Sequence, residues 1–396
     1  MWNILLGFFI LVLFGVLIHG QKPLGNSFSH YATEIFTRCA NRQFTPACYD
    51  EEIPKLMDRP TNLTMEETFE VTRLIQKKDS KYLYCHVLAH SLSYKETGKD
   101  LTKWKDVVAR CPTTMCNNGC QHGALMRRFN SETLTDAEIT KVTPDLANVC
   151  EPRGKWHPVE VERSMCYHAL GHLNMFVTGA DVKKSVGLCQ NVGTKPDGRN
   201  YIQTCTEGTL MTIYQPLEAE DRALVKGIVP TKESMASFCK QFMGEAYHAC
   251  HRESWPLFVD QVHRPDGLVA FCSYTDDMSE QRKCYATALN IITVYLVIGN
   301  ENKTDKISDF CRALPGDFGN LCFASAARRM VQIDPKLITG ALAICVKAAH
   351  YQLGDQCFNE LIRFSSLTYH KGSEDIGRYC GTFPGAWREK CLQNNQ

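Results

Sequence analysis

The sequence predicts an all-α fold: a right-handed α-solenoid of about ten disulfide-stapled helical hairpins, preceded by an N-terminal signal or anchor helix. Three observations predict it. Cysteines recur in pairs about eleven residues apart, the pairs recur with a period in the thirties, and helix-forming stretches alternate with turn residues. A fixed period of this length is typical of repeat arrays, in which each unit packs only against its neighbours.

The cysteine pairs are clearest in the C-terminal half. The second cysteines of successive pairs, Cys250, Cys284, Cys322, Cys357 and Cys391, are 34, 38, 35 and 34 residues apart. Toward the N-terminus this interval stays between 34 and 46 residues. Cys116 is the one cysteine that belongs to no repeating position, and Cys85 is the one repeating cysteine without a partner. The economical solution joins these two by a disulfide, although spacing alone does not prove connectivity. The predicted disulfides are Cys39–Cys48, Cys85–Cys116, Cys111–Cys120, Cys150–Cys166, Cys189–Cys205, Cys239–Cys250, Cys272–Cys284, Cys311–Cys322, Cys345–Cys357 and Cys380–Cys391.

Each repeat has the pattern of a helical hairpin. The stretch after a second cysteine, such as residues 322–331, is rich in helix formers with apolar residues three and four apart. A turn follows, for example Asp334-Pro335, and a second helical stretch, residues 337–345, runs to the next cysteine. We therefore expect each disulfide to tie the end of one hairpin to the start of the next.

Composition and the N-terminus indicate the compartment. Twenty cysteines are too many for a typical reduced cytosolic protein, and their number is even. Residues 2–18 are nearly all apolar, so residues 1–20 are expected to be a signal peptide or an uncleaved membrane anchor. Either alternative places the rest of the chain in an oxidising space: secreted, periplasmic, or on the extracytoplasmic face of a membrane. The net charge of +1 argues against a nucleic-acid partner.

Histidines divide the expected array into two parts. Residues 21–251 carry histidines just after several cysteines, whereas residues 252–396 have aromatic residues such as Tyr285, Phe323 and Phe358 near the same place. The sequence thus predicts a histidine-bearing N-terminal part and a purely structural C-terminal part.

One unit resembles a known repeat family. Residues 166–189 contain Ala169-Leu170-Gly171 within Cys-Tyr-His-Ala-Leu-Gly, a later Gly179, then Asp181 and a basic stretch. This unit is similar to Sel1-type repeats, relatives of the tetratricopeptide repeat, whose secreted cysteine-rich members also staple hairpins with disulfides. The resemblance is partial for residues 85–111 and weak elsewhere. It implies a helical scaffold that binds partners, and it implies no catalysis.

The histidines of the N-terminal part form a candidate metal site. Two histidines four residues apart on a helix face the same way, as in the pairs His86/His90 and His168/His172. Stacked hairpins repeat their orientation, so these side chains can converge on one groove. The candidate ligands are His86, His90, His122, His168, His172 and Glu207, and the candidate cofactors are zinc, copper or haem. The competing interpretation, favoured from sequence alone, is that these histidines only hydrogen-bond within the hairpins or line a wet surface.

Sharper catalytic motifs are absent from the sequence. His86 and His90 lack the intervening Glu of zinc proteases, and no Cys-x-x-Cys, phosphate loop or Gly-x-Ser-x-Gly occurs. The leading expectation is therefore a non-enzymatic scaffold that binds a protein or peptide partner, with membrane contact only through residues 2–18. The alternative is a metal- or haem-binding protein that uses the N-terminal histidines, with redox chemistry as one option.

Overall fold

The structure, a computed structural model, describes residues 26–79, 82, 85–112, 115–129, 133–297 and 303–395. The expected signal or anchor segment, residues 1–20, lies outside these ranges. All regular structure in the described ranges is helical, with no β-strand, so the predicted all-α class is confirmed. None of the described helices is both long and apolar enough to span a lipid bilayer.

The chain forms two compact units, Met1–Tyr82 and Leu83–Gln396. In the first unit, α2 packs against α4, and Cys39 at the end of α2 is joined to Cys48 of α3. A capping box begins α4, because the hydroxyl of Thr64 accepts from the backbone N–H of Glu67 and the Glu67 carboxylate accepts in return. The helices of this unit are α2 (Asn26–Cys39), α3 (Thr45–Glu52), η1 (Ile53–Met57) and α4 (Met65–Lys78).

The second unit holds the remaining helices, long and short ones in alternation for much of its length. They are α5 (His86–Lys99), η2 (Leu101–Lys103), α6 (Trp104–Arg110), η3 (Cys116–Asn118), α7 (Gly119–Phe129), α8 (Asp136–Ala147), α9 (Glu160–Val177), α10 (Val182–Cys189), α11 (Ile202–Tyr214), α12 (Ala219–Leu224), α13 (Met235–Cys239), α14 (Glu245–Glu253), η4 (Trp255–Phe258), α15 (Val259–Val262), α16 (Pro265–Cys272), α17 (Met278–Val297), α18 (Lys303–Arg312), α19 (Phe318–Ile333), η5 (Pro335–Leu337), α20 (Ile338–His350), α21 (Gly354–Thr368), α22 (Glu374–Gly381) and α23 (Gly385–Asn394).

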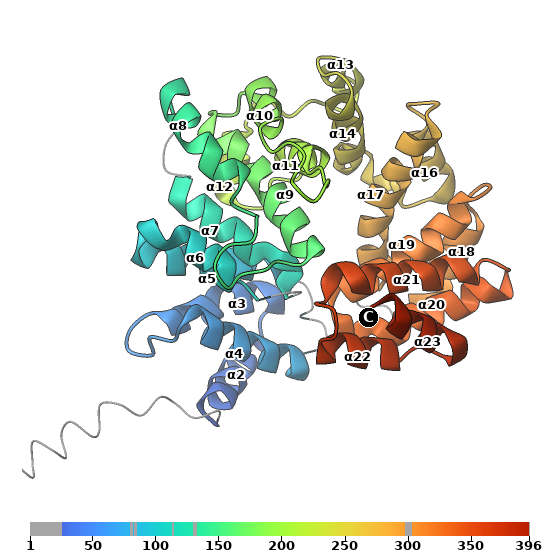
Figure 1. Cartoon of the computed structure of the whole chain (residues 1–396), viewed down its shortest axis with the longest axis horizontal. Coiled ribbons are helices and arrows are strands. Elements are labelled where there is room, and N and C mark those ends of the chain that lie inside the picture. The colour runs from blue at the N-terminus through green and yellow to red at the C-terminus, as the bar shows by residue number, and fades with distance from the viewer. Residues whose placement is uncertain are drawn as a thin grey trace, which may run out of the picture. The chain divides into compact units, whose positions relative to one another are not determined.

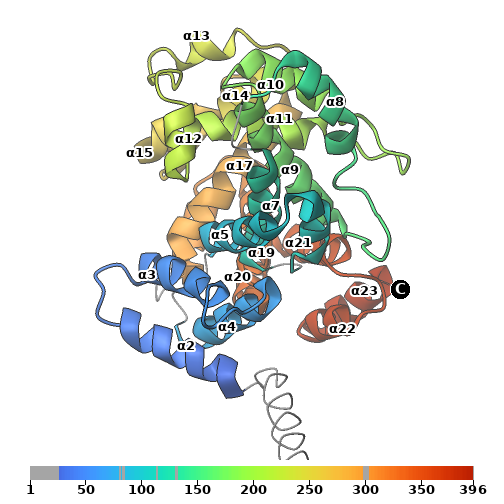
Figure 2. The same ribbon diagram turned by 90° about the vertical axis from the view of Figure 1, so that its left-hand side faces the viewer.

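One row of helices runs through the second unit. Helix α5 packs on α7, α7 on α9, α9 on α11, α11 on α14, α14 on α17, α17 on α19, and α19 on α21. The row turns back on itself, because α21 contacts α9 and α19 contacts η3. Figures 1 and 2 show α21 near one end of α9. The helices of the row therefore surround an interior. The right-handed solenoid, and the division of the array at residue 251, stay predictions.

The disulfides connect successive helices as expected. The structure contains the same ten pairs that the spacing predicts, and it has no free cysteine. In the C-terminal part, Cys311 of α18 is joined to Cys322 of α19, and Cys345 of α20 to Cys357 of α21. These cysteines are buried in the apolar core of that part, beside side chains such as Phe323. Each bridge thus fixes the start of one helix of the row to the end of the short helix before it.

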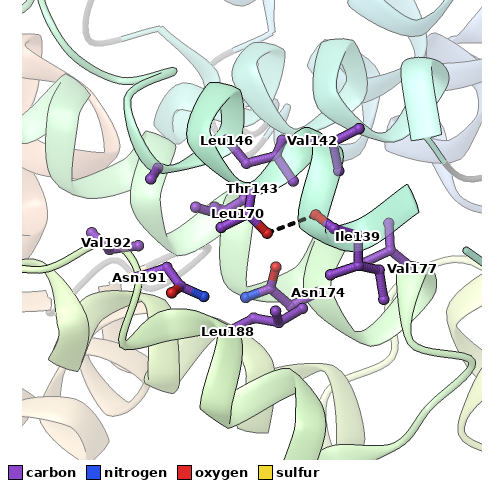
Figure 3. Close-up of a pocket in the computed structure, with 11 residues that line it drawn as sticks. Ile139, Val142, Thr143, Leu146, Leu170, Asn174, Val177, Leu188, Asn191 and Val192 are labelled. Atoms are coloured by element: carbon purple, nitrogen blue, oxygen red, sulfur yellow. Dashed lines mark hydrogen bonds between the residues drawn. The ribbon is translucent and has the colours of Figure 1, made fainter. Parts of the chain in front are cut away.

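A small apolar cavity lies between α8, α9 and α10 (Figure 3). Leu146, Leu170 and Leu188 line it, and the hydroxyl of Thr143 donates to the backbone oxygen of Ile139 rather than to a ligand. Its volume of about 10 Å³ is close to the least that one water molecule requires. We regard it as a packing void and not as a binding site.

Candidate metal centre

Helices α5 and α7 bring three histidines together. His86 and His90 are one turn apart at the start of α5, and His122 lies in the first turns of α7. Two glycines of α7 let these helices approach closely. A Cβ atom at Gly123 would lie 2.1 Å from the backbone oxygen of His90, and one at Gly119 would lie 2.4 Å from that of His86. Only glycine fits at such contacts, so close helix packing places the three imidazoles side by side.

The irregular disulfide of the array lies directly beside this cluster. Cys85 is the residue before His86 and caps the N-terminus of α5, and Cys116 begins η3. The backbone oxygen of Cys116 accepts a hydrogen bond from Nδ1 of His86 at 3.3 Å. The bridge thus holds the group that orients the first histidine. A second disulfide, Cys111–Cys120, fixes the helix that carries His122.

The ring nitrogens of the three histidines converge. One ring nitrogen from each of His86, His90 and His122 lies within 4.8 Å of the other two. The Nε2 atoms of His86 and His90 are 3.1 Å apart. Two imidazole nitrogens bound to one tetrahedral ion, with bonds near 2.0–2.1 Å, are about 3.3 Å apart. The separation of these two nitrogens is therefore compatible with a shared metal ion.

Hydrogen bonds to the opposite ring nitrogens fix the tautomers of His86 and His90. Nδ1 of His90 donates to Oε1 of Glu218 at 2.9 Å, and Nδ1 of His86 donates to the Cys116 backbone oxygen. With the Nδ1 protons placed there, the two Nε2 lone pairs face each other. Such a pair is stable only with a cation between them, either a proton or a metal ion.

His122 adds a third ring nitrogen to this pair. Its side chain is buried, and its Nε2 atom has no hydrogen-bond partner among the described residues. A proton shared by His86 and His90 leaves this nitrogen unsatisfied, which costs about 1–3 kcal/mol. A metal ion bound by all three imidazoles satisfies all three nitrogens at once.

Electrostatics keeps the imidazoles in the form that binds metals. Burial lowers the pKa values of His86, His122 and His172 well below the usual histidine value, and repulsion between neighbouring imidazoles lowers them further. Burial raises the pKa of the Glu218 carboxyl, but the hydrogen bond from His90 and the electrostatic attraction of His90 together outweigh burial, so the pKa is lowered. Neutral imidazoles backed by a carboxylate are the usual environment of a bound divalent ion.

A cavity of about 300 Å³ adjoins the cluster inside the second unit. Residues of α5, α7, α9 and α11 form one wall, and residues of α17 and α19, such as Asn290 and Arg329, form another. Three carboxylates, Glu207, Glu218 and Asp221, and one cationic side chain, Arg329, line it, which favours a cation. Three imidazole ligands would leave a tetrahedral ion one coordination position for a further ligand.

The structure places the other predicted ligands around the same cavity. His168 and His172 of α9 line it, and the ring centroids of His122 and His172 are 5.2 Å apart. Glu207 of α11 also lines it, but its carboxylate is paired with Arg252 at 2.8 Å and accepts from Gln203 at 2.9 Å. All six predicted residues thus meet in one place, three as a tight cluster and three at its edge.

Sequence reasoning missed several lining residues. Glu218 follows α11 in a segment without a motif, and Arg329 comes from the part expected to be purely structural. A signal for two others was present. The second and sixth residues after a cysteine are His168 and His172 in α9, and the same positions give His122 and Met126 in α7 and Glu207 and Met211 in α11. Both methionines line the cavity.

Two further histidines, one on each side of Cys250, lie elsewhere. His251 stacks on Tyr274 with ring centroids 4.4 Å apart, and His248 lies beside Glu280. Arg252, fully buried between them, pairs with Glu207, Glu245 and Glu280. This second cluster is an ion-pair network that fixes α14 against α11 and α17.

Comparisons with known protein families, with characterised proteins and with solved structures found no match for this chain. The similarity of residues 166–189 to Sel1-type repeats stays a prediction.

Proposed function

We propose that this protein binds a transition-metal ion through His86, His90 and His122, in an oxidising compartment outside the cytoplasm. The observation that carries the proposal is the convergence of three ring nitrogens whose surroundings require a cation: two Nε2 atoms at 3.1 Å and a buried, unpartnered third. Ten disulfides support the compartment, since such bonds persist outside the reducing cytosol.

Among the candidate cofactors, a bare ion suits the cluster better than haem. A haem iron offers protein ligands only two positions, on opposite faces of the macrocycle. Three imidazole nitrogens within 4.8 Å of one another need three adjacent positions. Imidazole ligands are typical of zinc, copper, iron and nickel, and zinc and copper are the ions we expect first.

A scaffold for a protein or peptide partner remains the second proposal. The helical array motivates it, with the partner on an outer surface. We place it second because the cavity that gathers the predicted residues has a volume of about 300 Å³, which fits a small molecule but not a peptide chain.

Metal analysis of the purified full chain tests the proposal. After treatment with a chelator and reloading with zinc, the wild type should retain at least one zinc ion per chain through dialysis. Replacing His86, His90 and His122 together by alanine should abolish retention. The matched control replaces His350 and His370, which are exposed, and should retain the ion. Equal retention by both variants, or none by the wild type, contradicts the proposal.

A further inference from the structure

A second set of metal-binding groups faces the same cavity across His122. His168 and His172 are one turn apart on α9, as His86 and His90 are on α5, and their ring centroids are 4.9 Å apart. The rings of His168 and His172 lie 6.0 and 5.2 Å from that of His122. His122 therefore stands between two pairs of histidines.

Helix α11 orients this second pair. Nδ1 of His172 lies 2.8 Å from the hydroxyl oxygen of Thr212. His168 hydrogen-bonds the backbone of Thr204, while its Nε2 lies 3.3 Å from Sδ of Met211. Thr204, Met211 and Thr212 all belong to α11. Glycine contacts again bring the helices together, since a Cβ atom at Gly208 would lie 2.0 Å from the backbone oxygen of His168.

The contact between His168 and Met211 has the spacing of two ligands of one metal ion. A thioether sulfur has no proton to donate. In the tautomer of His168 that carries its proton on Nδ1, the lone pair of Nε2 faces the sulfur. A nitrogen and a sulfur bound to one ion, with bonds near 2.0 and 2.3 Å, are about 3.5 Å apart. The observed 3.3 Å agrees with this spacing.

We infer that the cavity holds a second metal ion, bound by His168, His172 and Met211, and that this ion is copper(I). Soft thioether ligands select copper(I), and imidazole is also a good copper ligand. Two more cavity methionines, Met126 and Met165, surround the position with polarisable groups. The inference rests on the proposed function, because it adds a second ion to the cavity that adjoins the first.

Copper stoichiometry and X-ray absorption of the full chain test the inference. The wild type, loaded anaerobically with copper(I), should bind two ions per chain, and its spectrum should contain a sulfur scatterer near 2.3 Å. Met211→Leu, which preserves side-chain volume, should remove that scatterer and weaken one equivalent at least tenfold. The triple alanine variant at His86, His90 and His122 should keep one copper with the sulfur scatterer. Met243→Leu, at an exposed methionine, is the control and should match the wild type.

The outcomes separate this inference from the proposed function. One copper per chain with nitrogen scatterers alone, unchanged by Met211→Leu, overturns the second ion and leaves the first. Two coppers that are both unaffected by Met211→Leu also overturn the assignment of the second site. No bound copper or zinc at all overturns both proposals. Unchanged circular dichroism of Met211→Leu shows that any loss of copper comes from the ligand.

Discussion

Nδ1 of His90 lies 2.9 Å from Oε1 of Glu218, a residue 128 positions later in the chain. His90 belongs to α5, and Glu218 precedes α12, so the contact joins two segments that no local pattern connects. The carboxylate holds one ring nitrogen of His90 and directs the other toward His86. A ligand histidine backed by a carboxylate in this way is both oriented and made more basic.

Removing this carboxylate should weaken metal binding without removing a ligand. Glu218→Gln keeps an acceptor but loses the charge, and we expect the dissociation constant for zinc to rise about tenfold. Glu218→Ala should raise it further, up to about a hundredfold. Glu220→Gln changes an exposed carboxylate nearby and should have no effect. Competition with a chromophoric chelator measures the zinc affinity of all three variants. Equal zinc affinities of the Glu218 variants and the wild type would contradict the orienting role of this carboxylate.

The close helix contacts give a second prediction. In Gly123→Ala the new methyl group would meet the backbone oxygen of His90 at 2.1 Å, so α5 and α7 must separate. We expect a loss of about 2 kcal/mol or more in the free energy of unfolding, together with at least a tenfold loss of metal affinity.

Gly187→Ala is the matched control for this prediction. Gly187 lies inside α10, and nothing within 4 Å would meet an added Cβ atom. Alanine there should stabilise the protein by about 0.5–1 kcal/mol and leave metal binding unchanged. Urea unfolding and metal titration report both effects. A Gly123→Ala variant that keeps full affinity would show that close packing is not needed for the site.

The sequence predicts the parts of the site that recur with the repeat. Cysteine spacing predicts the helix pairs and their bridges, and histidines at fixed distances from the cysteines share a face because the helices are equivalent. Glu218 and Arg329 belong to no such register. They reach the cavity because the row of helices returns on itself, which depends on many small packing angles that a single sequence does not reveal.

The disulfide beside the cluster yields a third prediction. Replacing Cys85 and Cys116 by alanine frees the segment whose backbone oxygen orients His86. We expect stability to fall by about 2–5 kcal/mol and metal affinity to fall at least tenfold. The same double replacement of Cys380 and Cys391 should also destabilise the protein but leave metal affinity unchanged, because that bridge joins α22 to α23. Metal titration of both variants at low temperature, where both are folded, compares them.

A buried carboxyl in the cavity gives the last prediction, on pH. Burial raises the pKa of Glu253 to about 8, and the nearby carboxylate of Glu207 raises it too, against smaller opposing effects of Arg252 and of the hydrogen bond from Gln215. In the unfolded chain a glutamate has a pKa of about 4.3. Between these values the folded state binds the additional proton, so the free energy of unfolding must fall as pH rises, by at most about 1.4 kcal/mol per pH unit.

Glu253→Gln should remove this dependence, since its amide stays neutral and still accepts from Gln215. The variant and the wild type should be nearly equal in stability at pH 5, and the variant should be more stable by a few kcal/mol at pH 8.5. Glu389→Gln, at an exposed position, controls for the loss of one negative charge. Urea unfolding of the metal-free proteins at both pH values measures the difference. A wild type whose advantage over Glu253→Gln grows with pH would mean that Glu253 is ionised and stabilised in the folded state.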